Sequence, residues 1–280
     1  MNLVFQYQMS DPSVDDRSNL DGLPRHEFYN KVKDISSRSF QQYAKDIGAE
    51  YYFTDQDYFP ESSVKHYLKF FYNIAGLWMD PFFDSYENVL YVDTDIVCNT
   101  KENIFDQHTG EISGVLESDI KDDRGKYPYA AWDIKQSSFQ TLVSAYEANE
   151  VSIEDAMVLP PNNPSRVLCY NTGVLVWSKD ARVKAREKWD HWERWFNNGI
   201  ELKLPAWANN DQFYISAQCV KHDMDMNFLD QTWNDSPHYA NPEQLLESNF
   251  LHYSGGELKK QMLRRYEQGW FPTIKPEDKT

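Results

Sequence analysis

Basic residues, cysteine and long hydrophobic runs are all scarce in this sequence of 280 residues. Lys and Arg number 28 against 44 Asp and Glu, so the net charge is −16 and the isoelectric point is about 4.8. This charge argues against general nucleic-acid binding, which relies on basic patches that neutralise phosphates. It does not exclude one nucleotide held beside a divalent cation, since the cation presents positive charge locally.

The three cysteines, Cys98, Cys169 and Cys219, are odd in number and too widely spaced for a zinc pattern or a disulfide framework. Residues 1–17 lack the charged and apolar regions of a signal peptide. No run of about 18 apolar residues predicts a membrane-spanning helix. We therefore expect a cytoplasmic protein in a reducing compartment.

Hydrophobic residues make up 41% of the chain, which is enough for a large core. Aromatic residues reach 15%; core packing is their main expected role, and stacking on a sugar ring or a base is a second one. The length suits one α/β domain. We expect its nucleotide-binding half at about 1–120, its acceptor and catalytic half at about 121–260 and a C-terminal tail at 261–280.

Strands and helices are predicted to alternate through the first 120 residues. The expected strands lie at 3–5, 50–53, 88–97 and 114–116, and the expected helices at 24–47 and 62–79. This alternation is typical of a parallel sheet with helices on both faces. The second half is expected to hold a helix at 137–148, a strand at 167–177 and one long helix at 178–196. The predicted fold class is α/β, with a mixed, mostly parallel central sheet.

Asp93-Thr94-Asp95 directly follows the apolar segment Val-Leu-Tyr-Val of an expected buried strand. Ligands of open α/β sheets bind beyond the carboxyl ends of the strands. Two carboxylates at such a place offer the oxygen atoms that Mg²⁺ and Mn²⁺ prefer. A second Asp-x-Asp sequence, Asp223-Met224-Asp225, has no such strand before it, and we interpret it as a solvated loop.

Taken alone, the first motif also fits an aspartyl-phosphate phosphatase of the haloacid dehalogenase type. Asp93 would then be the nucleophile and Asp95 the general acid and base. That chemistry needs a later strand that ends in a second acidic cluster, and the sequence shows no such cluster. A non-catalytic sugar or nucleotide binder on the same fold is a further alternative.

Three other segments carry polar groups suited to a sugar-nucleotide site. Asn171-Thr172-Gly173 lies within an apolar strand, where a glycine marks a bulge or a close backbone approach. Asp211 and Gln212 are expected to begin a helix, and a plain helix cap is an equally good interpretation of Asp211. His252 is a candidate third metal ligand, although most lone histidines are structural; the following Gly255-Gly256 pair suggests backbone crowding against a ligand.

In this order the motifs resemble the retaining glycosyltransferases of family 8, the group of glycogenin and the lipopolysaccharide galactosyltransferases. The resemblance extends from residue 3 to about residue 260. Its motifs are Leu-Lys-Phe at 68–70, Leu-Tyr-Val-Asp-Thr-Asp at 90–95, Tyr-Asn-Thr-Gly-Val at 170–174, Asn-Asp-Gln at 210–212, Leu-Asp-Gln-Thr-Trp-Asn at 229–234 and His-Tyr-Ser-Gly at 252–255. It implies the GT-A type of nucleotide-sugar-binding domain.

The resemblance also implies roles for individual residues. Asp93, Asp95 and His252 would bind Mn²⁺ or Mg²⁺, and Asn171, Asp211 and Gln212 would contact the donor sugar near the reaction centre. The remaining donor-site residues would be Gln6 and Tyr7 near the uracil and ribose, Lys69, Thr94 and Gly255 along the donor, Glu117 or Asp119 near the sugar, and Lys259 near phosphate. Leu258 stands where the family usually has its phosphate-binding lysine, and Lys259 is the nearest basic residue.

We therefore expect a metal-dependent hexosyltransferase that moves a sugar from UDP to an acceptor hydroxyl with retention of configuration. The acceptor would be a glycan, a lipid or a protein. The segment from Lys259 to Phe271 mixes basic and apolar residues. Peripheral contact with a membrane is one expectation for it, and an ordinary surface helix is the other.

Overall fold

The main sheet has the strand order β2-β1-β3-β8-β5-β9. It belongs to a computed structural model that describes residues 1–8, 22–62, 64, 71–116, 137–152, 154–158, 166–167, 169–205, 208–237 and 247–274. The strands are β1 (Asn2–Tyr7), β2 (Glu50–Thr54), β3 (Asn88–Val92), β5 (Ile112–Leu116), β8 (Tyr170–Ser178) and β9 (Met226–Phe228). Only β8 is antiparallel to its neighbours in this sheet, so five of the six strands point the same way. The predicted mixed, mostly parallel sheet is confirmed.

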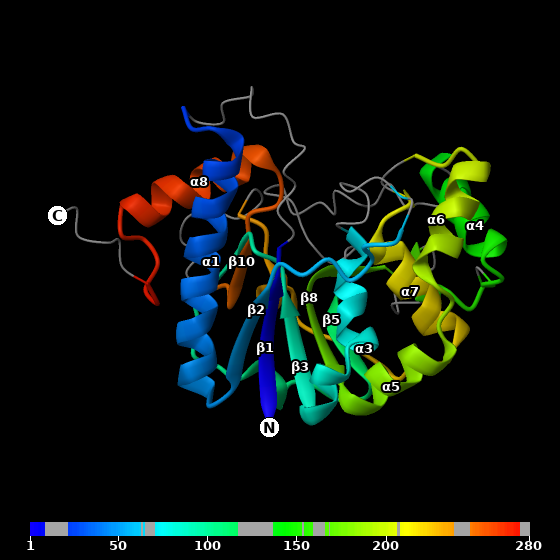
Figure 1. Ribbon diagram of the computed structural model, residues 1–280, viewed down its shortest axis with the longest axis horizontal. Helices are drawn as coiled ribbons and strands as arrows, with labels where there is room; N and C mark the ends of the chain where they lie inside the picture. The colour runs from blue at the N-terminus through cyan, green and yellow to red at the C-terminus, as the bar shows by residue number, and fades with distance from the viewer. Residues whose placement is uncertain are drawn as a thin grey trace.

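Helices cover both faces of this sheet (Figure 1). The α-helices are α1 (Arg25–Ile47), α3 (Gly76–Met79), α4 (Ser137–Ala148), α5 (Lys179–Lys188), α6 (Trp192–Glu201), α7 (Asp211–Lys221) and α8 (Gly256–Glu267). Short 3₁₀ helices are η1 (Asn73–Ala75), η2 (Pro81–Ser85), η3 (Ile104–Asp106) and η7 (Gln231–Asn234). In Figure 1, α1 and α8 lie on one side of the strands, and α3 to α7 lie on the other.

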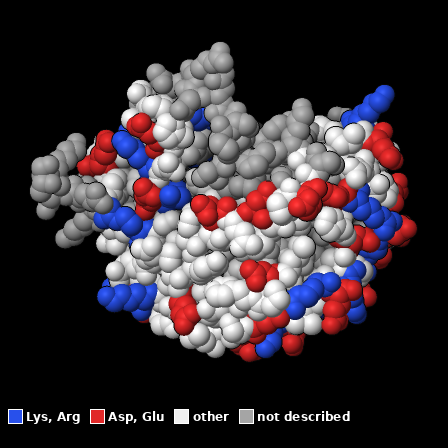
Figure 2. All heavy atoms as spheres, viewed as in Figure 1, with Lys and Arg blue, Asp and Glu red and all other residues white. Residues whose placement is uncertain are grey.

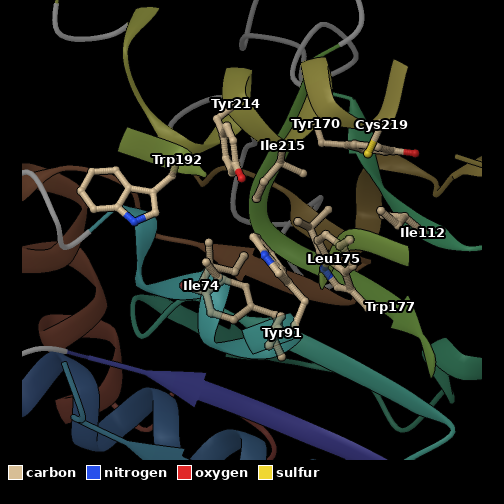
Figure 3. Packing of buried hydrophobic residues seen from close by; sticks show 14 of the residues in the cluster. Ile74, Tyr91, Ile112, Tyr170, Leu175, Trp177, Trp192, Tyr214, Ile215 and Cys219 are labelled. Carbon is tan, nitrogen blue, oxygen red and sulfur yellow. The ribbon is translucent and has the colours of Figure 1, made fainter. Parts of the chain in front are cut away.

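Neighbouring side chains of a strand enter different hydrophobic clusters, one on each face of the sheet. In β1, Leu3 and Phe5 belong to the cluster that also contains residues of α3, α5 and α7. Val4 belongs to the cluster that contains residues of α1. Because both faces are buried, the strands have continuous apolar sequences. Figure 3 shows part of the first cluster, with Tyr91 of β3, Leu175 and Trp177 of β8, Ile74 of η1, and Tyr214 and Ile215 of α7.

A second, two-stranded sheet lies beside α1. It consists of β4 (Ile96–Cys98) and β10 (Phe250–His252), which are antiparallel and pair His252 with Ile96. A third two-stranded sheet is formed by β6 (Met157–Val158) and β7 (Arg166–Val167). The pairing of β4 with β10 returns the end of the chain to the segment that follows β3.

The C-terminal helix packs inside the protein through its apolar side chains. Leu258, Met262 and Leu263 of α8 share a hydrophobic cluster with the N-terminal half of α1, and Phe271 is 2% exposed in the same cluster. Arg265 lies over the ring of Trp270 at 5.1 Å from its centroid. The expected peripheral contact with a membrane is therefore not supported, because the core occupies the apolar face. The alternative, an ordinary amphipathic surface helix, agrees with this packing.

Two predicted elements are divided in the structure. The helix expected at 178–196 becomes α5 and α6, because the chain is extended at Trp189 and starts again with His191 as the cap of α6. This turn aims Trp192 and Trp195 into the core. Ser178 caps α5 by accepting a hydrogen bond from Ala181 N.

The strand expected at 88–97 ends at Val92. Residues 93–95 turn away from the main sheet, and Ile96 continues in the second sheet as part of β4. Of the strand expected at 167–177, the main part is β8, which begins at Tyr170 and includes Asn171-Thr172-Gly173. Of the helix expected at 62–79, the described part from residue 71 onward is helical, but Ser62 is not.

Acidic side chains form a band across the middle of the face shown in Figure 2. Basic side chains on that face lie mainly toward its edges. Among the described residues, none of the helices combines the length and the apolar character needed to cross a membrane.

Candidate functional site

The turn between β3 and β4 is fixed by backbone hydrogen bonds on both sides. Asp93 N donates to Gly173 O of β8 at 2.9 Å, and Tyr253 N donates to Asp95 O at 2.9 Å. The turn lies at the carboxyl end of β3, the edge at which α/β sheets bind their ligands. Since β10 pairs His252 with Ile96, the same register brings His252 beside Asp95.

Three side chains from these segments form the group of His, Cys, Asp or Glu residues in the described chain that could hold a metal ion: Asp93, Asp95 and His252. Their candidate ligand atoms lie within 4.8 Å of one another. His252 Nε2 is 3.3 Å from Asp95 Oδ1 and 3.9 Å from Asp93 Oδ2. The side chains of Asp95 and His252 are 13% and 9% exposed, whereas that of Asp93 is 37% exposed, so the group opens toward solvent at Asp93.

Each of these three side chains is also in hydrogen-bond contact with one further residue. Tyr91 Oη donates to Asp93 Oδ1 at 2.8 Å, which leaves Oδ2 on the side of His252. Lys259 Nζ donates to Asp95 Oδ2 at 2.5 Å, which leaves Oδ1 facing His252. The third contact joins His252 Nδ1 to Asn234 Oδ1 at 2.9 Å. Three atoms therefore point toward a common centre.

The pKa values of the three residues shift in different directions. Burial, with the nearby charge of Asp95, raises the pKa of Asp93. Burial also acts to raise the pKa of Asp95, but Lys259 and His252 outweigh it and hold that pKa below its usual range. Burial acts to lower the pKa of His252, yet Asp95 and Asp93 outweigh it and raise this pKa. Two carboxylates so close together need a positive charge between them.

A divalent cation fits this group of residues. Asp95 Oδ1 is a buried oxygen that accepts no hydrogen bond within the described part of the chain. When His252 is neutral with its proton on Nδ1, Nε2 and Asp95 Oδ1 are two acceptors that face each other, and a cation between them would satisfy both. Two carboxylate oxygens and one imidazole nitrogen form a ligand set suited to Mn²⁺ or Mg²⁺ that leaves positions open for a substrate.

Asp211 lies at the N-terminus of α7, next to the group. Its Oδ2 accepts a hydrogen bond from Thr172 Oγ1 at 2.7 Å. Burial and the nearby charge of Asp93 raise the pKa of Asp211 to about 7, against the hydrogen bond from Thr172. The helix cap is Asn210, whose side chain accepts from Phe213 N, so Asp211 is not the plain cap that its position allowed.

Asn171 and Gln212, the other predicted sugar contacts, lie close to these residues. Asn171 is 8% exposed, and its Oδ1 accepts from Gly173 N at 3.0 Å and from Asn234 Nδ2 at 2.8 Å. Gln212 Nε2 lies 4.0 Å from Cys169 Sγ, and Gln212 remains partly exposed. Asn171 is therefore occupied by hydrogen bonds within the protein, while Gln212 is partly exposed to solvent.

The residues predicted to bind the nucleoside are more deeply placed than expected. Gln6 is completely buried: its Nε2 donates to Ser36 Oγ at 2.8 Å and to Asp93 O at 3.2 Å. Its side chain therefore stabilises the turn at Asp93 through a hydrogen bond and exposes no surface to a ligand. Tyr7 is 2% exposed and packs near the ring of Tyr58.

Other predicted donor-site residues have local partners or lie outside the described chain. Thr94 Oγ1 donates to Gln8 Oε1 at 3.0 Å. Gly255 has a φ of 89°, a conformation that glycine adopts without strain, and a Cβ atom there would meet nothing within 4 Å. The positive φ is by itself a reason for glycine at this position, and the expected crowding against a ligand stays a prediction. Lys69 and Glu117 lie outside the described residues, as does Asp119.

Tyr91 and Asn234 are site residues to which sequence reasoning assigned no role. Tyr91 lies two residues before Asp93, on the same side of the strand, and that spacing is a usable signal. Asn234 ends the motif Leu-Asp-Gln-Thr-Trp-Asn, which carried part of the resemblance but had no individual role. Its contact with His252 depends on a long-range pairing that no local pattern reveals.

Comparison with known proteins gives similarities of structure. No family model matches the chain, and no curated protein sequence matches it. A glycosyltransferase involved in glycosylation of the major capsid of PBCV-1 is similar with a TM-score of 0.48 and 14% identity, over 94% of this chain and 98% of that one. The galactosyltransferase LgtC, in complex with donor and acceptor sugar analogs, has a TM-score of 0.47 and 12% identity, over 99% and 98% of the two chains.

The bifunctional glycosyltransferase WbbM has a TM-score of 0.48 and 14% identity. The match covers 90% of this chain but 45% of that one, so this chain spans about half of WbbM. At such identities the similarity concerns the fold, and the chemistry has to follow from the residues of this chain. In overall fold, the chain is similar to glycosyltransferases of known structure.

Proposed function

We propose that this chain is a metal-dependent glycosyltransferase that moves a hexosyl group from a UDP-sugar to an acceptor hydroxyl, with retention of configuration. The observation that carries the proposal is the convergence of Asp93 Oδ2, Asp95 Oδ1 and His252 Nε2 at the carboxyl end of β3. The order of the sequence motifs supports it independently. A bound divalent cation would neutralise the charge that develops on the departing diphosphate.

Asp93, Asp95 and His252 would hold the cation, and Tyr91, Lys259 and Asn234 would keep their side chains in place. Most of these supports are buried, so little reorganisation would accompany binding. Lys259 also adds a positive charge beside Asp95, at a position from which it would favour an anionic donor. A cytoplasmic location and a glycan, lipid or protein acceptor are part of this proposal.

Asp211 and Gln212 would form the wall that faces the sugar. Asp211 lies near enough to Asp93 for the two charges to interact, and its raised pKa keeps part of the population protonated near neutral pH. It would therefore accept or donate a hydrogen bond to a sugar hydroxyl. We propose that the acceptor hydroxyl attacks on the face from which the diphosphate leaves, and that its proton passes to the departing phosphate oxygen. Close positioning of the two reactants would supply much of the rate.

The experiment is release of UDP from a panel of UDP-sugars by the full chain, with Mn²⁺, with Mg²⁺ and after chelation. The proposal predicts release that depends on the cation and on one donor sugar. Binding of UDP without release from any donor and acceptor tested would favour the non-catalytic binder. Hydrolysis of a phosphate ester with Mg²⁺, with an acyl-phosphate trapped on Asp93, would instead establish the phosphatase.

A further inference from the structure

Two buried asparagines connect the start of β8 to the imidazole of His252. Asn234 is completely buried at the end of η7. Its Nδ2 donates to Asn171 Oδ1 at 2.8 Å, and its Oδ1 lies 2.9 Å from His252 Nδ1. Asn171 Oδ1 in turn accepts from the backbone N–H of Gly173 at 3.0 Å. The contacts form a continuous chain from a backbone amide to the histidine ring.

The donor and acceptor roles along this chain follow from its first member, because a backbone N–H can only donate. The atom of Asn171 that Gly173 N faces is therefore the amide oxygen. That oxygen requires the NH₂ group of Asn234 to point toward it, so the oxygen of Asn234 points toward His252. An amide oxygen only accepts, so Nδ1 of His252 carries a proton. In the neutral ring, Nε2 then has a free lone pair.

We propose that Asn234 is a positioning residue that holds His252 in its Nδ1–H tautomer, and that Asn171 acts through Asn234 by fixing the direction of its amide. The inference rests on the proposed function in one respect, that a divalent cation is the partner of Nε2. It assigns Asn171 a role different from the predicted contact with the donor sugar. Partners of this kind on a ligand histidine set its tautomer, and their loss costs roughly 10–100-fold in metal affinity.

Gly173 contributes a second constraint on the same ring. A Cβ atom at this position would lie 2.6 Å from His252 Cε1 and 2.9 Å from Nδ1, so the imidazole packs directly against the glycine backbone. The segment Asn171-Thr172-Gly173 therefore supplies the surface under His252, the N–H that starts the chain and the amide that continues it. The close backbone approach expected at Gly173 is therefore its approach to the imidazole of His252.

The test compares Asn234→Leu with Asn234→Asp. The leucine removes the acceptor at Nδ1, whereas the aspartate keeps an acceptor there, loses the donation to Asn171 and adds a negative charge. Affinity for Mn²⁺ alone is measured from the EPR signal of the free ion. The tautomer of His252 is read from the ¹⁵N NMR signals of histidine-labelled protein at a pH high enough that these signals no longer change, because Asp95 and Asp93 raise the pKa of this ring against the effect of burial. Asn149→Leu is the matched control, since Asn149 is a buried amide at the end of α4.

We expect Asn234→Leu to weaken Mn²⁺ binding by roughly 10–100-fold and to mix the two tautomers of His252. Asn234→Asp should keep the Nδ1–H form and recover most of the affinity, and Asn149→Leu should change neither. A folded Asn234→Leu protein with wild-type affinity and an unchanged tautomer would overturn the inference. So would equal losses in the leucine and aspartate variants, which indicate a packing role.

If Asn234→Leu does not fold, Asn171→Ala provides the second variant. It leaves Asn234 in place but frees its amide to turn, which would present NH₂ to Nδ1 and favour the Nε2–H tautomer. An unchanged tautomer in folded Asn171→Ala would then overturn the role of Asn171. Sugar transfer is not a readout of these measurements. A wild-type protein that turns over no UDP-sugar would contradict the proposed function and leave this test intact.

Discussion

Asp95 Oδ1 and His252 Nε2 face each other at 3.3 Å, although one follows β3 and the other ends β10. Backbone pairing sets this relationship: His252 is opposite Ile96 in the β4–β10 ladder, and Tyr253 N donates to Asp95 O. The side chains therefore approach each other as a consequence of strand register. A substitution of either side chain should leave that backbone arrangement in place, which makes the site open to mutational tests.

His252→Ala should weaken the binding of Mn²⁺ and of UDP together, because the imidazole is one of three candidate ligands and the nucleotide would bind through the cation. We expect a loss of at least about 10-fold in each. Calorimetric titration with Mn²⁺, and then with UDP in the presence of Mn²⁺, measures both. An unchanged affinity for UDP in Mn²⁺ would count against the ligand role of His252.

Gly173→Ala should also weaken Mn²⁺ binding, since the added methyl group would overlap the His252 ring and displace it from its present position. We expect a loss of roughly 10-fold or more. Gly114→Ala is a matched control, because a Cβ atom there would lie 2.6 Å from Leu175 Cδ2 in the neighbouring strand. Both variants should be destabilised, but the loss of metal affinity should be confined to Gly173→Ala. Equal metal affinities in the two variants would refute this explanation.

Lys259→Met should have opposite effects on the metal and on the nucleotide. The ammonium group lies 2.5 Å from Asp95 Oδ2, so its removal takes away a positive charge that opposes a cation nearby. We expect tighter binding of Mn²⁺ alone by a few-fold, since such charges interact by on the order of 1 kcal/mol. UDP binding in Mn²⁺ should weaken. Lys260→Met, which removes an outer pair with Glu257, should change neither affinity.

Asp211→Asn should stabilise the metal-free protein at high pH. The folded state holds the pKa of Asp211 at about 7, above the ordinary value of 3.8, so it binds more protons than the unfolded state between these values. The free energy of unfolding therefore falls as pH rises through this window and stays low above it. An asparagine at this position cannot titrate, so the loss of stability at high pH disappears, and its amide oxygen still accepts the hydrogen bond from Thr172.

We expect Asp211→Asn to exceed the wild type in stability by on the order of 2 kcal/mol near pH 8, with little difference near pH 4. Urea denaturation at the two pH values measures this. Thr172→Val is the matched variant: it removes the hydrogen bond that opposes the pKa shift, so the fall in stability should extend to higher pH and become larger in total. A stability difference between wild type and Asp211→Asn that does not change with pH would contradict the account.

Local patterns were sufficient for much of the fold. The helix expected at 24–47 corresponds to α1, and Phe28, Val32 and Ile35, which recur at helical spacing, face the core. The apolar run before Asp93 predicted β3, because a strand buried on both faces has such a run. The sequence did not reveal that β8 runs against its neighbours, since strand direction depends on connections that lie outside any local window.

The candidate site was predictable only where its residues carry a chemical signature. Asp93, Asp95 and His252 have functional groups that attract attention and stand at the ends of apolar segments. Asn234 and Tyr91 do not, since an asparagine after an aromatic residue and a tyrosine in a strand have ordinary structural uses. Gln6 shows the opposite case: a polar residue beside the expected donor site whose amide holds the Asp93 turn.

The most direct test of the account is Mn²⁺-dependent release of UDP by the wild type and by Asp95→Asn, with the donor sugar found in the panel. The substitution keeps the size of the side chain but removes a charged ligand that faces His252 Nε2. The account predicts that release falls to background in the variant while its far-ultraviolet circular dichroism and its cooperative unfolding are retained. Full activity in folded Asp95→Asn protein would contradict it.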